Sequence, residues 1–120
     1  TGSARTVDRI IDAFPANQQE QIRAQLSVSI VGVISQVLLP RADGEGRVAA
    51  FEVMLMNSAI ANLIRKNETN KIPSTIQTSR RHGMTTLDDF LIDLANREVI
   101  THETALGAAQ DRRDLEARLG

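Results

Sequence analysis

Cysteine, tryptophan and tyrosine are absent from the 120-residue sequence, and phenylalanine occurs only three times. Without cysteine, the chain can form no disulfide, no thiolate zinc site and no cysteine nucleophile. The scarcity of aromatic side chains argues against the stacking platforms on which proteins hold single-stranded nucleic acids. The longest purely apolar runs have four residues, as in 53–56, which is too short for a transmembrane helix or for the apolar core of a signal peptide.

A large charge of either sign is also missing. The 14 lysine and arginine residues nearly balance the 15 aspartate and glutamate residues, so the formal net charge is −1. This balance excludes a polybasic arm and an acidic tail, and we expect no direct nucleic-acid partner. The composition is typical of one small globular domain or of a piece of a longer protein. Because the first residue is Thr1 rather than methionine, we expect a chain that was processed, tagged or cut from a longer one.

The first half of the sequence predicts two helices followed by a β-hairpin. Apolar residues at helical spacing indicate a first helix that ends before Pro15, and a second helix begins at about Asn17. Residues 28–39 are rich in β-branched side chains and predict a strand. A turn at 40–46 (PRADGEG) connects it to a second predicted strand, 47–56.

Both predicted strands are apolar on both faces, apart from Glu52 in the second. A strand of this kind is typical of a sheet that is covered on both sides, yet only two helices precede the hairpin. Since two strands alone make a marginal sheet, we expect these strands to belong to a larger sheet whose other strands are missing.

The second half of the sequence predicts only helices. Four of the predicted helices have a polar residue that can cap the N-terminus. The candidate caps are Asn57 or Ser58, Thr85 or Thr86, Thr101, and Asp111, and Pro73 suits the first turn of a further helix. The fold class is therefore α/β at the start of the chain and all-helical at its end.

Motifs for phosphate binding, metal binding and catalysis are absent from the sequence. No glycine-rich phosphate loop occurs, and the two histidines, His82 and His102, do not have metal-ligand spacing. The acidic residues Asp88, Asp89 and Asp93 are better explained by helix-dipole complementation and solubility than by catalysis. The densest basic patch, residues 80–82 (RRH), is typical of a solvated loop but could also meet a phosphate or a partner's carboxylates. A helix-turn-helix over 86–109 is disfavoured, because its second helix has no arginine or lysine.

Several segments, taken in order, resemble the type II/IV secretion ATPases. The similar segments are 5–15 (RTVDRIIDAFP), 33–38 (VISQVL), 46–54 (GRVAAFEVM), 59–66 (AIANLIRK), 76–78 (IQT) and 83–88 (GMTTLD). The segment 59–66 is similar to the signature AIRNLIRE of the retraction-type, PilT-like subfamily. Ala61 stands where the signature has arginine, and Lys66 stands where it has glutamate.

The resemblance implies the C-terminal part of a hexameric, cytoplasmic ATPase that powers type IV pilus retraction at the inner membrane. Residues 1–56 would end a RecA-like core, and 57–120 would form a helical subdomain. The ATP- and magnesium-binding motifs of the parent would lie upstream of Thr1, so we expect this chain alone to be inactive, with no catalytic, cofactor or metal residues of its own. The alternatives are a pilus extension or type II secretion ATPase, and a stand-alone helical adaptor.

The resemblance also implies which residues make contacts. We expect the helix 58–66 to couple ATP-driven motion to the pilus platform machinery, with Asn62 and Arg65 as its polar contacts. The apolar members of this helix form a stripe that is typical of a buried core. The full candidate set is Ala59, Ile60, Asn62, Leu63, Ile64 and Arg65, and the candidate subunit-interface residues are Arg9, Arg80 and Arg81.

Overall fold

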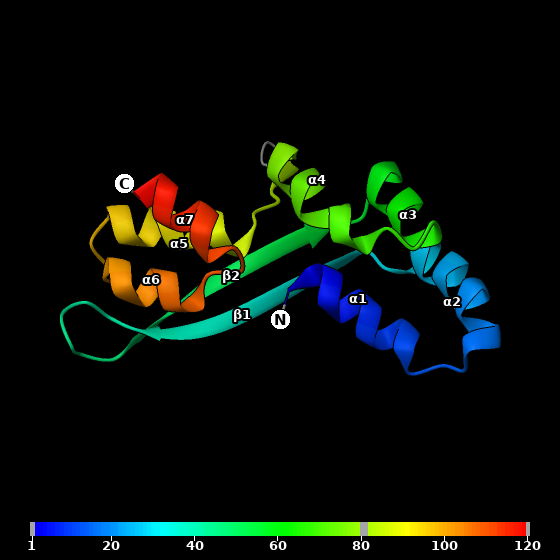
Figure 1. Ribbon diagram of the computed structural model, residues 1–120, viewed down its shortest axis with the longest axis horizontal. Helices are drawn as coiled ribbons and strands as arrows, with labels where there is room; N and C mark the ends of the chain where they lie inside the picture. Colours follow the sequence, from blue (N-terminus) through cyan, green and yellow to red (C-terminus); the bar gives the residue numbers. More distant parts are fainter. Residues whose placement is uncertain (1, 80–81, 120) are drawn as a thin grey trace.

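A long β-hairpin with helices packed along it forms the fold (Figure 1). The computed structural model describes residues 2–79 and 82–119. The elements, in chain order, are α1 (Ser3–Asp12), α2 (Ala16–Ser29), β1 (Gly32–Pro40), β2 (Arg47–Leu55), α3 (Ser58–Arg65), the 3-10 helix η1 (Thr69–Lys71), α4 (Ile72–Thr78), α5 (Leu87–Asn96), α6 (His102–Ala108) and α7 (Arg112–Leu119). The molecule is elongated, with principal extents of 50 × 27 × 24 Å.

The predicted helix caps are confirmed at all four helices. The side chains of Asn57, Thr86 and Thr101 accept the backbone N–H of Ile60, Asp89 and Thr104 at the starts of α3, α5 and α6, and Asp111 accepts that of Asp114 in α7. Pro73 lies in the first turn of α4, as predicted. These features are local in sequence, which is why the residue pattern alone identifies them.

One boundary differs from the prediction. The helix α2 continues to Ser29, so Val28 is helical, and β1 begins only at Gly32. Three of the β-branched residues that suggested an early strand therefore lie outside it: Val28 at the end of a helix, and Ile30 and Val31 in the connection after it. The packing of α2 against α3 outweighs the weak intrinsic preference of valine for strands.

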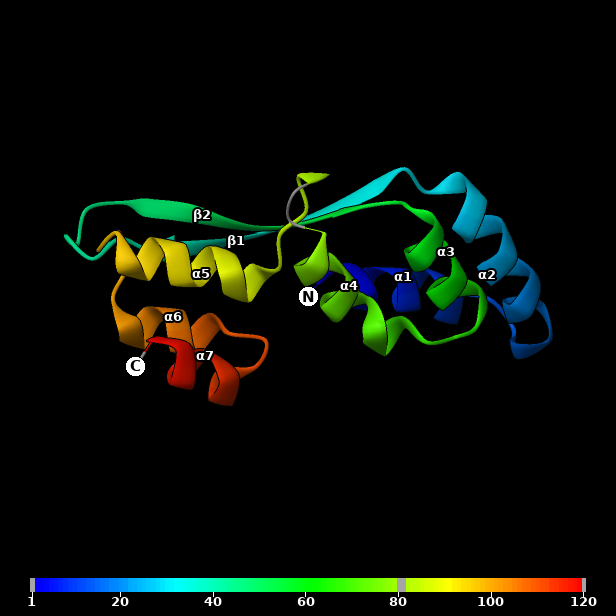
Figure 2. The same cartoon turned by 90° about the horizontal axis from the view of Figure 1, so that it is seen from above.

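The hairpin is covered on one face only. In the antiparallel register, Val33 pairs with Met54 and Val37 pairs with Ala50, and these side chains face the helices. On the opposite face Ile34 is 71% and Leu38 is 51% exposed. Figure 2 shows α1, α3, α4 and α5–α7 on the same side of the hairpin. The expectation that the strands are covered on both sides is therefore wrong for the described residues, because their helices lie on a single side.

The two edges of the hairpin also differ. At the outer edge of β2, Val53 and Thr85 exchange two backbone hydrogen bonds of 2.9 and 3.1 Å. Since Val53 directs its backbone groups away from β1, its register partner Ile34 directs its own N–H and C=O toward the outer edge of β1. Among residues 2–79 and 82–119, no strand pairs with that edge.

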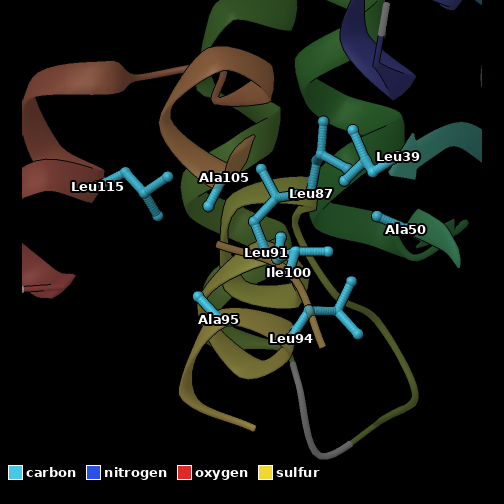
Figure 3. Packing of buried hydrophobic residues seen from close by; sticks show 9 residues of the cluster. All are labelled: Leu39, Ala50, Leu87, Leu91, Leu94, Ala95, Ile100, Ala105 and Leu115. Carbon is cyan, nitrogen blue, oxygen red and sulfur yellow. The ribbon is translucent and has the colours of Figure 1, made fainter. Parts of the chain in front are cut away.

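Two separate hydrophobic clusters lie along the hairpin. The first joins the hairpin near its turn to helices α5–α7, which we call the C-terminal lobe (Figure 3); its buried members include Leu39, Ala50, Leu91 and Leu115. The second joins the other end of the hairpin to α1–α4, which we call the N-terminal lobe; its buried members include Val7, Met54, Ile64 and Ile76. Each cluster combines residues from both sides of position 56.

Candidate functional site

The helix α3 divides the six candidate coupling residues into a buried and an exposed set. Ile60 and Ile64 are fully buried in the N-terminal lobe, and Leu63 is half-buried beside them. Ala59, Asn62 and Arg65 are exposed. Positions 59 and 62 are three residues apart and therefore lie on one side of the helix. The surface that α3 can offer a partner is thus small and polar, and its apolar stripe belongs to the core.

Arg65 also has an internal contact. Its guanidinium Nη1 donates to Ser27 Oγ at 3.4 Å, and Ser27 Oγ donates to the carbonyl of Ala24 at 2.7 Å. This chain connects the last turn of α3 to the last turns of α2. Arg65 therefore helps to hold two helices together in addition to being exposed.

The two departures from the retraction-type signature lie in different environments. Ala61, which stands where the signature has arginine, is buried. Lys66, which stands where the signature has glutamate, follows the last residue of α3 and is exposed. The second departure therefore reverses a charge on the exposed surface beside Asn62.

Of the three candidate subunit-interface residues, Arg9 alone lies among the described residues. Arg9 is exposed on α1, next to the exposed Ile10. Three residues later, Asp12 ends the helix and begins an exposed stretch that continues to Phe14. Arg80 and Arg81 lie outside the residues that the structure describes. Their role as an interface stays a prediction.

The acidic residues of α5 have three different environments. Asp88 is buried, and its two carboxylate oxygens accept the backbone N–H of Gln110 and Asp111 at 2.8 and 3.0 Å. Asp89 forms an ion pair of 2.5 Å with Arg118, and this hydrogen bond raises the pKa of Arg118. Asp93 is exposed and pairs with Arg97. Asp88 and Asp89 lie in the first turn of α5, which fits the predicted dipole complementation. Asp88 also accepts the backbone N–H groups of the segment that precedes α7.

Glu52 is the residue whose environment the sequence did not reveal. The residue is 2% exposed, and its carboxylate lies between the two lobes, where it contacts both α1 and α5. Oε2 accepts the N–H of Ser3, the first residue of α1, at 2.6 Å, and Oε1 accepts the N–H of Leu87, the first residue of α5, at 3.3 Å. In the sequence it is only a polar interruption of an apolar strand, and its partners are 49 and 35 residues away.

Two cavities lie where the lobes face each other, and the first of them reaches Glu52. One of about 430 Å³ is lined by Glu52, Gly2 and Arg5, among others. The other, of about 460 Å³, is lined by Asp88, Ser74 and Arg118, among others. Pro73 and Gln110 line both. The two lobes therefore leave open space between them, while Glu52 itself stays buried.

Metal and membrane sites can be assessed for the described part of the chain. Within it, no three histidine, aspartate or glutamate side chains gather in a group that could hold a metal ion. Nor does any helix in these residues have the length and apolar content needed to span a membrane. The candidate site that this structure offers is therefore a set of contact surfaces on α3 and between the lobes.

Comparison with known proteins gives relatives over almost the whole chain. The chain is 45% identical over 115 residues to a twitching motility protein of Neisseria gonorrhoeae, covering 96% of this chain and 31% of that protein. It is 44% identical over 105 residues to the type IV pilus retraction ATPase PilT of Pseudomonas aeruginosa, covering 88% of this chain and 30% of that protein. The chain thus spans about a third of the length of these relatives. No protein-family model matches it.

Solved structures agree with the sequence relatives. A crystal structure of the pilus retraction motor PilT with bound ADP matches with a TM-score of 0.84 and 42% identity, over 98% of this chain and 32% of that one. The Legionella pneumophila ATPase DotB matches with a TM-score of 0.68 over 88% of this chain. At 18% identity, the second match shows a shared fold alone.

Proposed function

Because this chain belongs to the PilT-like family of pilus retraction ATPases, we propose that it is the C-terminal portion of a hexameric motor that powers type IV pilus retraction. The observation that carries the proposal is the match to the retraction motor over nearly the whole described fold, at 42% identity. Nucleotide and magnesium would be bound by the rest of the motor, since the sequence of this chain has no phosphate-binding loop.

The chain would contribute the end of a RecA-like core over residues 1–56 and a helical subdomain over 57–120. The bare face of the hairpin supports this layout. Ile34 and Leu38 are exposed, and the backbone groups of Ile34 point toward an edge to which a further strand can bond. The relatives are about three times as long as this chain, so their remaining residues can supply the missing strands and the cover of this face.

The exposed side of α3 would couple ATP-driven movement to the pilus machinery. Ala59 and Asn62 lie on that side, while Ile60 and Ile64 fix the helix in the core. Arg65 is exposed and connects α3 to α2 through Ser27. Movement of the core would therefore reach this surface through rigidly packed helices. The partner would be the platform machinery at the cytoplasmic side of the inner membrane.

The test is a comparison of two activities in one variant of the full-length protein. We expect Asn62→Ala combined with Arg65→Ala to leave the ATPase rate largely intact and to abolish twitching, because the catalytic groups lie elsewhere. Glu103→Ala, an exposed position on α6, is the control and should leave both activities unchanged. Normal twitching of the double variant would show that α3 is structural only. Loss of both activities together with the melting transition would make the pair part of the core.

A second expectation follows for the 120-residue chain on its own. It should not bind Mg-ATP with micromolar affinity, because the backbone-amide cradle, the lysine and the metal-holding hydroxyl of a phosphate-binding loop are absent from its sequence. Isothermal titration calorimetry measures this directly, and micromolar binding would contradict the assignment of the nucleotide site to the rest of the motor.

A further inference from the structure

We infer that Glu52 is a latch that fixes the orientation of the N-terminal and C-terminal lobes relative to each other. The inference concerns the geometry of this chain and does not depend on the proposed role in pilus retraction. Glu52 lies on β2, and its carboxylate bonds to the first N–H group of one helix from each lobe. In Figure 1 the starts of α1 and α5 lie on either side of the middle of the hairpin.

The chemistry of the contact favours a strong hold. The first N–H groups of a helix have no partner within the helix, and the helix dipole gives this end a partial positive charge. A carboxylate accepts such an N–H group, and its negative charge interacts favourably with the helix dipole. Glu52 does this for α1 and for α5 at the same time. Because Glu52 is nearly inaccessible to water, either helix that moves away leaves a carboxylate oxygen and an N–H group without a partner. Such losses typically cost more than an exposed hydrogen bond does.

The packing around Glu52 is otherwise loose. The two hydrophobic clusters have no member in common, and cavities of about 430 and 460 Å³ lie where the lobes face each other. Figure 2 shows the α5–α7 group below the turn half of the hairpin and the α1–α4 group at the other end of the hairpin. Apolar packing therefore holds each lobe together, while the angle between the lobes depends on the hairpin and on this carboxylate.

The first residues of the chain approach Glu52 closely. A Cβ atom at Gly2 would lie 3.1 Å from Glu52 Oε2 and 2.5 Å from Gln110 Nε2, in the segment between α6 and α7. Gly2 has an extended backbone with φ 176°, so glycine is favoured here by space rather than by conformation. The N-terminus of α1 therefore packs against both β2 and the C-terminal lobe. A shift of α1 would displace Glu52 and Gln110.

Ser3 provides a matched pair of variants. Its hydroxyl is buried and has no hydrogen-bond partner among the described residues, so Ser3→Ala removes no bond and retains the N–H that Glu52 accepts. Ser3→Pro removes that N–H. Proline is well tolerated at the first position of a helix, and the extended backbone of Gly2 suits the residue before a proline. The two variants therefore differ mainly in the latch.

The experiment measures the distance between the lobes by pulsed electron paramagnetic resonance on the 120-residue chain, diluted with an excess of unlabelled chain so that labels on different copies do not contribute. Because the sequence has no cysteine, Asn62→Cys on α3 with Glu103→Cys on α6 gives one label in each lobe. Asn62→Cys with Gln18→Cys places both labels in the N-terminal lobe as a control. All three positions are exposed. Ser3→Pro and Glu52→Gln should each widen the inter-lobe distance distribution by about twofold or shift its maximum. They should leave the distribution within the N-terminal lobe unchanged, and Ser3→Ala should match the parent chain in both.

Two results would overturn the latch. One is an inter-lobe distribution in Ser3→Pro and Glu52→Gln that is identical to that of Ser3→Ala. The other is a Ser3→Pro chain without a cooperative melting transition beside a normally folded Ser3→Ala chain, since the contact would then belong to the fold itself. If Glu52→Gln alone fails to fold, the comparison of the two Ser3 variants still decides the question.

Discussion

The two lobes are stabilised in different ways. In the N-terminal lobe the stabilisation comes mainly from apolar burial, with Val7, Ile60, Ile64, Ile72 and Ile76 fully buried. In the C-terminal lobe the apolar cluster is accompanied by polar closures: the caps at Thr86 and Thr101, the Asp88 contacts with the chain entering α7, and the Asp89–Arg118 ion pair.

The lobes also differ in what they leave exposed. Near the N-terminal lobe, an apolar ridge runs from the end of α2 into β1, where Val28 is 79% and Val31 is 83% exposed, and Ile34 continues it. Among the described residues of α5–α7, no large hydrophobic side chain is exposed in this way. The described surface of α5–α7 is polar, whereas the N-terminal lobe and β1 expose a group of apolar side chains. Exposed apolar groups of this kind are typical of a surface that packs against another part of a protein or a partner.

The largest expected effect tests the apolar core of the N-terminal lobe. Ile64→Ala should lower the free energy of unfolding by about 2–5 kcal/mol, because it leaves a cavity in a fully buried position. Leu63→Ala, at the half-buried neighbour, should cost about 1–2 kcal/mol. Urea denaturation followed by circular dichroism gives both values. Equal losses would mean that α3 does not bury one side more deeply than the other.

A smaller effect tests the polar closure of the C-terminal lobe. Asp88→Ala should cost about 1–3 kcal/mol, because the N–H groups of Gln110 and Asp111 lose their acceptor. Asp93→Ala on the same helix should cost less than about 0.5 kcal/mol, since its ion pair with Arg97 is exposed. Hydrogen exchange of α7 should increase in the first variant and not in the second. If both variants behave alike, Asp88 is not a closure of this lobe.

Substitutions in the exposed apolar ridge should have the smallest effect on stability. Their effect on the association of chains should be large. The 120-residue chain should form dimers or higher oligomers through the bare face and free edge of the hairpin. Ile34→Lys should change the free energy of unfolding by less than about 0.5 kcal/mol while it shifts the chain toward monomer. Light scattering at high concentration measures the association, with Glu45→Lys in the exposed turn as control. A monomeric parent chain would remove the contrast between the lobes.

The sequence predicted the features that depend on neighbouring residues. Helix caps such as Asn57 and Thr101, and the hairpin around the glycine-containing turn, are encoded within a few positions. The helix predicted at 58–66 was also located correctly, with Ile60 and Ile64 as core residues, while its coupling role stays a prediction. The run of β-branched residues hid the end of α2, because packing against α3 is not visible in a local pattern.

The residues that connect distant segments could not be found in this way. Glu52 was noticed only as an exception in an apolar strand, and nothing near it in sequence indicates that it accepts N–H groups from α1 and α5. The same holds for Asp88, whose partners lie 22 and 23 residues further along the chain. The helix dipole alone is a sufficient reason for an acidic residue in the first turn of a helix. The sequence therefore gives no sign that Asp88 also accepts N–H groups from a distant segment.

The way in which the N-terminal lobe closes has a consequence for the order of folding. Asp8 on α1 accepts a hydrogen bond of 2.7 Å from Thr69 Oγ1 in η1, 61 residues away, whereas α5, α6 and α7 follow one another directly along the chain. Bringing distant segments together carries an entropy penalty that grows with the length of the intervening loop, and long-range contacts slow folding. During refolding, the backbone amides of the hairpin and of the helices after it should therefore become protected from hydrogen exchange first. The N-terminal helix α1 should pack against them last.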